Sequence, residues 1–266
     1  MPTLRLTVEY DGRRFHGWQR QPRLRTVQGE LEAALATVLR EPVSVAGAGR
    51  TDAGVHALAQ TASLRTAAEI PPQRIRSGVN ALTGPDVCVR AITPVADDFH
   101  ARHSAWARHY AYLLLGEPSA FWGHRALLVE PLPALERLAA AAHALVGVHD
   151  FAAFSCATAD EDSTHTHLLY ARWQRWGRGL MLQVGARRFL YRMVRAIVAQ
   201  TLDVAAGRLP ADDTARRLAR PVARATRIAP AHGLHFLAAE YRLGSQGAAP
   251  VAPRGGSHCE PPEAVL

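Results

Sequence analysis

Two successive segments of the chain carry the same order of hydrophobic patterns. Each contains an alternating stretch, a helical stretch, two further extended stretches, a second helical stretch and a last extended one. Alternation of apolar and polar residues predicts a half-buried strand, whereas an apolar stripe at a spacing of three and four residues predicts a helix packed on a sheet. The repeated order β-α-β-β-α-β predicts an α+β fold made of two ferredoxin-like halves.

The first half is expected within residues 1–104. Thr26 is a suitable N-cap for its first helix because its hydroxyl can accept a backbone hydrogen bond. Pro72 stands where the second helix is expected to begin, which is a favourable position for proline. The predicted elements are strand 4–10, helix 27–39, strands 43–48 and 57–64, helix 72–82 and strand 87–93.

The second half is expected within residues 105–243. Its glycine-rich turn at 177–179 separates two strands of a hairpin. Residues 244–266 are rich in Gly, Pro and Ala and show no period, so we expect a disordered tail. The predicted elements are strand 107–115, helix 133–146, strands 168–176 and 180–186, helix 189–205, a short helix at 212–220 and strand 234–241.

A glycine-rich loop lies between the predicted strands 43–48 and 57–64. It presents a cation, a hydroxyl and a carboxylate in succession, at Arg50, Thr51 and Asp52. The spacing of its glycines fits neither a dinucleotide-binding turn nor a P-loop, and the chain contains no lysine for the latter. An isolated aspartate in such a loop more often caps its own turn than takes part in chemistry. The residues around Asp52 therefore decide its interpretation.

The run Arg-Thr-Asp-Ala-Gly-Val-His at residues 50–56 resembles the signature of the tRNA pseudouridine synthase A family. The resemblance covers roughly residues 3–242, and several blocks agree in the order in which the family has them. It implies that the two halves join into one long antiparallel sheet, with the active site in the cleft between them. The other blocks are Tyr10-Asp11-Gly12, Gly17-Trp18-Gln19-Arg20-Gln21, Thr26-Val27-Gln28, Asp97-Asp98-Phe99-His100-Ala101-Arg102, Arg108-His109-Tyr110 and Met193-Val194-Arg195.

The resemblance implies an isomerase with three catalytic residues. Asp52 matches the carboxylate that forms a covalent intermediate, on either the ribose C1′ or the uracil C6. Arg195 matches the arginine that pairs with this carboxylate, and Tyr110 matches the active-site tyrosine. Burial favours the neutral form of a carboxylate, so a guanidinium close to Asp52 is needed to keep it ionised. Without the resemblance, Tyr110 reads as a core tyrosine and Arg195 as a surface arginine.

The family acts on uridines 38 to 40 of tRNA as a homodimer, so we expect tRNA and a second copy of the chain as partners. A uridine in a stem is reached only by flipping it out. Arg50 is then the first candidate to enter the vacated space or to grip the adjacent phosphate. His56, Arg20 and Arg102 are further candidates for RNA contact. The family often has an arginine near residues 164–167 that this chain lacks.

The overall charge agrees with an anionic partner. The formal net charge is +8, the pI is about 10.2, and all 31 basic residues are arginine. Arginine forks onto phosphate and stacks on bases. The loop over residues 11–23 interleaves arginines with aromatic residues, which suits backbone contact plus stacking. For Trp18 in this loop, base stacking and burial in the core both stay open.

No cofactor or metal is expected, because the isomerisation needs neither. The His-x-His pair at 165 and 167 near Cys156 fits no standard zinc spacing, and the charged stretch 97–103 reads as a solvated linker. Three scattered cysteines indicate a reducing, cytoplasmic location. The chain begins on a strand pattern and has no long apolar run, so we expect neither a signal peptide nor a membrane span.

Two other functions explain part of the pattern. A non-catalytic RNA-binding protein with a basic ferredoxin-like sheet accounts for the charge and the fold. It leaves the combination of Asp52, Arg195 and Tyr110 unexplained, and the sequence has no RNP-type aromatic motifs. A pseudouridine synthase that modifies ribosomal RNA is the second alternative. The matching blocks favour tRNA over ribosomal RNA, and mapping the modified position separates the two.

Overall fold

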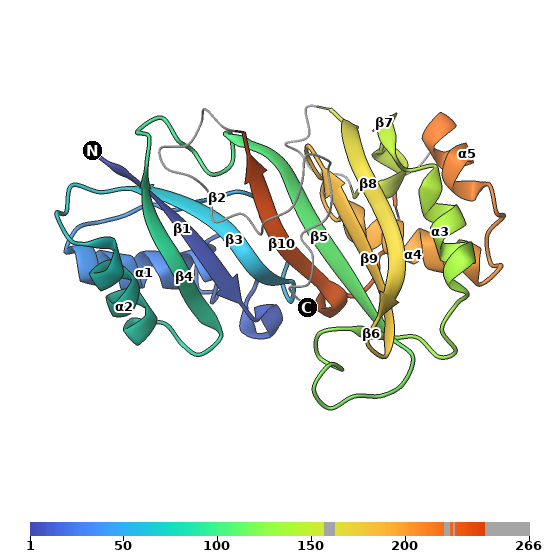
Figure 1. Ribbon diagram of the computed structural model, residues 1–266, viewed down its shortest axis with the longest axis horizontal. Coiled ribbons are helices and arrows are strands. Elements are labelled where there is room, and N and C mark those ends of the chain that lie inside the picture. Colours follow the sequence, from blue (N-terminus) through green and yellow to red (C-terminus); the bar gives the residue numbers. More distant parts are fainter. Residues whose placement is uncertain (157–162, 221–223, 226, 243–266) are drawn as a thin grey trace. The chain divides into compact units, whose positions relative to one another are not determined.

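The computed structural model describes residues 1–156, 163–220, 224–225 and 227–242 (Figure 1). The described residues form two compact units, one made of residues 1–108 together with residues 236–242, the other of the described residues within His109–His235. Each unit combines strands of an antiparallel sheet with helices, so the predicted α+β class is confirmed. The division into domains at residues 104 and 105 stays a prediction, and the tail expected at 244–266 lies outside the described residues.

The first unit has the predicted β-α-β-β-α-β order. Its sheet runs β4-β1-β3-β10, and β1 pairs antiparallel with both β3 and β4. α1 packs against α2, and α2 packs against β4 (Figure 1). The elements are β1 (Thr3–Tyr10), α1 (Val27–Leu39), β2 (Ala46–Gly47), β3 (His56–Arg65), α2 (Pro72–Leu82), β4 (Val87–Val95) and β10 (Leu234–Tyr241).

Local sequence explains these elements. Alternate residues of β1 are buried, as its pattern predicts. The Thr26 side chain accepts a hydrogen bond from the backbone of Gly29 and thus caps α1. Pro72 is the first residue of α2. The core of this unit includes the fully buried side chains of Leu6, Leu31, Leu35 and Ile75.

The strand predicted at 43–48 is wrong over most of its length, because β2 is only Ala46–Gly47. Side chains of α1 take the backbone groups of Val45 that a strand would use. Glu32 accepts from the Val45 amide at 2.9 Å, and Gln28 donates to the Val45 carbonyl at 3.0 Å. With both groups satisfied, the chain has no need of a strand partner there.

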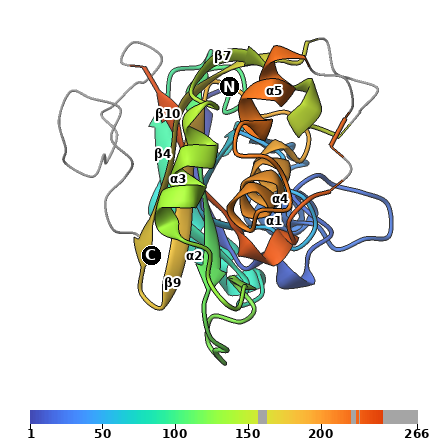
Figure 2. The same ribbon diagram turned by 90° about the vertical axis from the view of Figure 1, so that its right-hand side faces the viewer.

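The second unit has a sheet in the order β5-β9-β8-β7. The predicted hairpin is confirmed as β8 and β9, which pair antiparallel around Gly177. α3 packs against α4 and β8, and α5 packs against both helices (Figure 2). The elements are β5 (Ala105–Leu115), β6 (Leu127–Leu128), α3 (Leu135–His143), β7 (Gly147–Asp150), β8 (His165–Trp176), β9 (Gly179–Ala186), α4 (Met193–Ala205) and α5 (Asp213–Ala219).

Two details of this unit differ from the prediction. The short strands β6 and β7 have no clear sequence pattern and were not expected. The helix predicted from residue 189 begins at Met193, because Arg192 has a left-handed backbone conformation with φ 60°. Before that point, Leu190 is buried while the chain is still irregular. The hydrophobic pattern therefore predicted a helix that begins too early in the sequence.

Candidate functional site

The loop from Ala48 to Val55 connects β2 to β3 and carries the residues singled out in the sequence. The Thr51 side chain is buried, Asp52 is half-buried and Arg50 is exposed. The loop thus holds one carboxylate at the boundary between core and solvent, with a cation two residues away on the outside. Such a position keeps a carboxylate accessible while limiting its freedom.

Two buried side chains, one on β1 and one on β3, hold this loop by hydrogen bonds. The hydroxyl of Tyr10 on β1 lies 2.8 Å from Thr51 Oγ1. Gln60 on β3 donates from Nε2 to the carbonyl of Gly49 at 2.9 Å. Burial raises the pKa of Tyr10 to about 12, so its hydroxyl is neutral and keeps its proton at neutral pH. The residue before Asp52 is therefore tied directly to the sheet.

The turn that follows β1 supports the loop from a second side. The amide of Trp18 donates to the Thr51 carbonyl at 3.0 Å. Gly17 has φ +89°, and a Cβ there would come within 2.6 Å of the same carbonyl oxygen, so only glycine fits. Trp18 is 2% exposed and its ring packs near Tyr10. The structure thus decides for the core, and the interpretation of Trp18 as a base-stacking residue is wrong.

His56, the first residue of β3, contacts the turn that follows β1. Its Nδ1 accepts from the Gly12 amide at 3.2 Å and lies 3.3 Å from Asp11 Oδ1. The first contact requires an unprotonated Nδ1 and the second a protonated one, so the tautomer of the ring decides which of the two forms. The side chain is 3% exposed. This burial favours a structural role for His56 over the RNA contact expected from the sequence.

Arg108 connects the start of the loop to the segment before β5. Its Nε and Nη2 donate to the Ala48 carbonyl at 3.1 and 3.0 Å. Nη1 donates to the Ala105 carbonyl at 3.1 Å, and Nη2 also reaches the Arg102 carbonyl. One guanidinium thus holds three backbone carbonyls together, which a lysine could not do with the same geometry.

Three of the predicted RNA-contacting arginines are exposed in the same unit as Asp52. Arg50 and Arg102 have exposed side chains. Arg20 is exposed as well and forms an ion pair with Glu32 at 3.1 Å. Their exposure agrees with a role in binding an anionic partner, and the contacts themselves stay a prediction.

Tyr110 lies on β5 in the second unit and is 7% exposed. The ring of Phe189 stands edge-on to it with centroids 5.0 Å apart. The preceding residue is also fixed, since His109 Nδ1 lies 2.8 Å from the Tyr170 hydroxyl. These contacts hold the tyrosine ring in one orientation, which suits a stacking surface.

Arg195 differs from the rest of α4 in its burial. The helix has 13 residues, and every one of them except Arg195 is buried. Its Nε donates to the Ala229 carbonyl at 2.8 Å, and the Ala229 amide donates to the Arg195 carbonyl at 2.9 Å. A charged residue in an otherwise buried helix is costly unless its polar groups are satisfied. The position of Arg195 is therefore a specific one rather than that of an ordinary surface arginine.

The predicted site residues divide between the two units. Asp52, Arg50, His56, Arg20 and Arg102 belong to the first unit, whereas Tyr110 and Arg195 belong to the second. Within the first unit, Arg108 links Arg102 to the loop of Asp52. The pairing of Asp52 with Arg195 stays a prediction.

The linker histidine and the cysteine considered for metal binding make local contacts. His100 Nδ1 accepts from the amides of Arg102 and His103, so it caps its own turn. The Cys156 thiol donates to the Ala225 carbonyl. Among the described residues there is no group of three or more His, Cys, Asp or Glu side chains that could hold a metal ion. No helix in the described ranges is long and apolar enough to cross a membrane.

Sequence reasoning missed the residues that hold the site. Tyr10, Gln60 and Arg108 contact the loop of Asp52, and Ala229 contacts Arg195. Tyr10 and Arg108 do stand in blocks that resemble the family, and those blocks were the available signal. For Gln60 and Ala229 the sequence holds no such signal.

Comparison with known proteins bears on the whole chain. A family model described as tRNA pseudouridine synthase matches residues 6–104 and 141–242. The chain belongs to the tRNA pseudouridine synthase family. A tRNA pseudouridine synthase A of Chlorobium luteolum is 43% identical over 239 residues, which cover 88% of this chain and 93% of the relative. Those of Chlorobaculum tepidum and Maricaulis maris are 42% and 40% identical, covering 81% and 91% of this chain and 88% and 98% of the relatives.

Membership of the pseudouridine synthase family makes this chain an enzyme of the isomerase class. Asp52 and Arg195 fall inside the two matched ranges, whereas Tyr110 and Arg108 lie in the interval between them. The two charged candidates therefore stand in the parts of the chain that the family model describes. The anchored loop around Asp52 is the local structure that the family signature produces in this chain.

Proposed function

We propose that this enzyme converts uridines 38, 39 and 40 in the anticodon stem-loop of tRNA to pseudouridine, with Asp52 as the nucleophile. Family membership and the names of the relatives support the reaction class and the tRNA substrate. The observation that carries the assignment of Asp52 is its loop. The loop that carries this half-buried carboxylate is held at Gly49 and Thr51 by hydrogen bonds from β1, from β3 and from the turn between β1 and α1.

The reaction rearranges one nucleoside. The bond between ribose C1′ and uracil N1 breaks, a bond between C1′ and C5 forms, C5 loses its proton and N1 gains one. Nothing is oxidised and no group is lost, so the step needs no cofactor. Asp52 supplies a covalent intermediate by attacking either C1′ or C6, which splits a difficult exchange into two easier steps. Both orders use the same carboxylate.

Arg195 and Tyr110 complete the proposed site. The guanidinium of Arg195 pairs with the carboxylate of Asp52. The Tyr110 ring stacks on the flipped uracil, and its hydroxyl helps remove the proton from C5. The edge-on contact with Phe189 supports this role, because it fixes the ring before substrate arrives.

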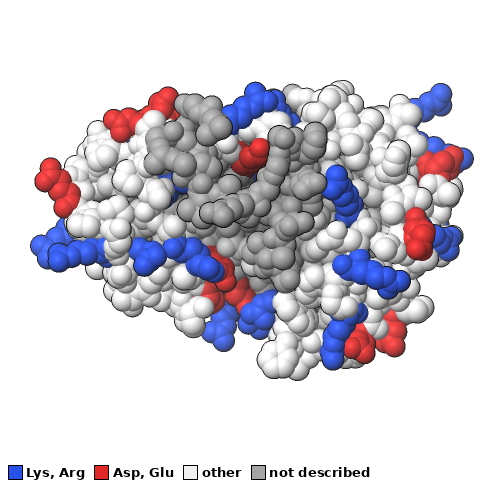
Figure 3. Space-filling view, in the orientation of Figure 1, with Lys and Arg blue, Asp and Glu red and all other residues white. Residues whose placement is uncertain are grey.

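Recognition of tRNA rests on shape and charge in this proposal. Three neighbouring uridines are accepted, which is incompatible with strict reading of one base. Arginine side chains on both units, with carboxylates among them on the face in Figure 3, support binding to the phosphate backbone. We further propose that the enzyme acts as a homodimer in the cytoplasm. Analytical ultracentrifugation tests the dimer, and a monomer at working concentration refutes it.

Release of tritium from tRNA labelled with [5-³H]uridine tests the catalytic assignment. Wild-type protein should release tritium, and Asp52→Ala should release none while its tRNA affinity stays within about twofold of wild type. Asp52→Asn is the matched variant, since it keeps the volume and removes the charge. Tritium release by Asp52→Ala at the wild-type rate would eliminate Asp52 as the nucleophile.

The salt dependence of binding tests the recognition mode. Neutralising phosphates with arginines releases counterions, so log Kd should rise linearly with log salt with a slope of several units. A flat dependence contradicts backbone recognition. Substrate preference is tested in parallel, because modification of ribosomal RNA transcripts in place of tRNA would support the alternative substrate class.

A further inference from the structure

Residues Arg227 to Pro230 form an irregular segment that runs beside α4, and we call it the 227–230 segment. Polar groups from two elements, α4 and β5, hold it in place. Ala229 exchanges two hydrogen bonds with Arg195, one to its backbone and one to its side chain. The Tyr112 hydroxyl on β5 donates to the Pro230 carbonyl at 2.9 Å. Arg227 donates from Nη1 to Asp203 Oδ1 at 2.5 Å.

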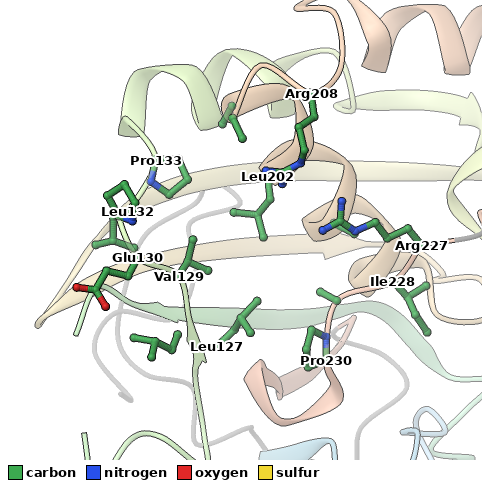
Figure 4. A pocket seen from close by; sticks show the side chains of 16 residues that line it. Leu127, Val129, Glu130, Leu132, Pro133, Leu202, Arg208, Arg227, Ile228 and Pro230 are labelled. Atoms are coloured by element: carbon green, nitrogen blue, oxygen red, sulfur yellow. The ribbon is translucent and has the colours of Figure 1, made fainter. Parts of the chain in front are cut away.

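The segment also lines a cavity of about 620 Å³, together with Ala199, Leu202 and Ala205 of α4. Arg227, Ile228 and Pro230 lie on one side of the cavity, and Leu132 and Pro133 lie on the other (Figure 4). An open cavity provides no packing atoms on that side. The polar anchors to α4 and β5 are therefore needed to fix the part of the segment that lines the cavity.

Arg195 depends on this segment for its orientation. The bond from Nε to the Ala229 carbonyl sets the plane of the guanidinium. The charge of Arg195 also acts on Tyr112. Burial raises the pKa of the Tyr112 hydroxyl, and the positive charge of Arg195 opposes that rise. Tyr110 and Tyr112 are two residues apart on β5 and so project from the same face. The segment, the arginine and the proposed stacking tyrosine thus belong to one side of the unit.

We propose that the 227–230 segment positions Arg195 for the isomerisation, and that Tyr112 and Arg227 are positioning residues that act through it. The inference rests on the proposed function, in which Arg195 pairs with the nucleophilic carboxylate. Neither Tyr112 nor Arg227 touches the substrate in this account. Loosening either anchor lets the segment move toward the cavity and takes Ala229 away from the guanidinium.

Tyr112→Phe tests the first anchor with a single hydroxyl removed. We expect kcat to fall about fivefold, with KM and tRNA affinity unchanged, because one buried hydrogen bond that holds the segment is lost. Tyr241→Phe is the matched control. Its hydroxyl donates to the Ala101 carbonyl at 2.8 Å, and burial raises the pKa of that tyrosine as well. The Tyr241 hydroxyl bonds to Ala101 and not to the 227–230 segment, so its variant should keep kcat within twofold of wild type.

Arg227→Ala tests the second anchor against Arg208→Ala. Both arginines pair with Asp203 Oδ1 and are more than half exposed, but only Arg227 belongs to the segment. We expect Arg227→Ala to lower kcat about threefold or more and Arg208→Ala to leave it unchanged. If either arginine contacts tRNA instead, Kd and KM change and kcat does not, which would overturn the positioning role for Arg227.

The split between kcat and KM separates positioning from a loss of stability. A displaced guanidinium slows the chemical step and leaves substrate binding in place, so kcat should fall in Tyr112→Phe and Arg227→Ala while KM and tRNA affinity stay at their wild-type values. Both quantities should stay at their wild-type values in the two controls. Folding of each variant is checked by its thermal midpoint, and the kinetics are measured below that temperature.

Wild-type kcat in both variants would overturn the inference. So would a loss of thermal stability with kcat unchanged at temperatures where the variants are folded. The proposed function fails separately, because its failure means that Asp52→Ala retains activity. An inactive Asp52→Ala together with unaffected Tyr112→Phe and Arg227→Ala leaves the nucleophile in place and removes only the positioning segment.

Discussion

Replacing Tyr10 with phenylalanine removes one hydroxyl and leaves the buried ring in place. The hydroxyl lies 2.8 Å from Thr51 Oγ1, in the residue next to Asp52. Both side chains are buried, with exposed fractions of 3% and 8%. The substitution therefore leaves a buried threonine hydroxyl without this partner, in the loop that carries the proposed nucleophile.

The magnitude follows from the burial of both partners. Leaving one buried polar group unsatisfied costs roughly 1–3 kcal/mol. We expect about 1.5 kcal/mol for Tyr10→Phe, and about the same for Thr51→Val, which keeps the shape of the side chain. The double variant should cost about 2 kcal/mol rather than about 3, because the bond is lost only once. A coupling of about 1 kcal/mol is therefore predicted.

Urea denaturation of the four proteins measures the stability cycle, and single-turnover pseudouridine formation measures its effect on the reaction. If the loop loses its orientation, about 1 kcal/mol corresponds to a roughly fivefold lower rate. Additive changes in the free energy of unfolding would show that the two hydroxyls do not interact. Coupling in stability with unchanged single-turnover rates would show that the loop needs no fixed orientation for the reaction.

Three further predictions concern other parts of the first and second units. Gly17→Ala should destabilise the protein by about 2 kcal/mol or more and lower kcat. The backbone of Gly17 is left-handed, and the added Cβ would meet the Thr51 carbonyl. An unchanged free energy of unfolding in urea melts would contradict this. Arg108→Lys should lower kcat about fivefold with tRNA affinity nearly unchanged, because a lysine cannot hold the same carbonyls; a change in affinity alone would refute it. Burial lowers the pKa of His100 and His232 below 6.5, so the unfolded chain binds more protons near that pH. The free energy of unfolding should therefore fall as the pH is lowered from 7.5 to 5.5, and an unchanged urea midpoint would contradict the burial of these rings.

The order of strands and helices was predictable because each long element carries its own period. β1, α1, α2 and the β8–β9 hairpin appear where alternation, capping and proline placed them. The loop of Asp52 was predictable for a different reason, namely the density of glycines and the family signature. Local sequence thus determines the elements whose hydrogen bonds and burial are satisfied locally.

The remaining features depend on contacts between residues far apart in the chain. β2 is short because Gln28 and Glu32 on α1 take the backbone groups of Val45. Trp18 is in the core because the turn after β1 folds under the loop of Asp52. No periodicity contains such information, since it arises only when the elements pack. For the same reason the segment that holds Arg195 was not visible in the sequence.

Mapping of modified positions in a single tRNA transcript tests the central claim most directly. Carbodiimide treatment followed by primer extension locates each pseudouridine after incubation with wild-type protein or with Asp52→Asn. We predict modification confined to positions 38 to 40 by the wild type and none by Asp52→Asn, although both bind the transcript. Pseudouridine formed at the wild-type rate by Asp52→Asn would contradict the account.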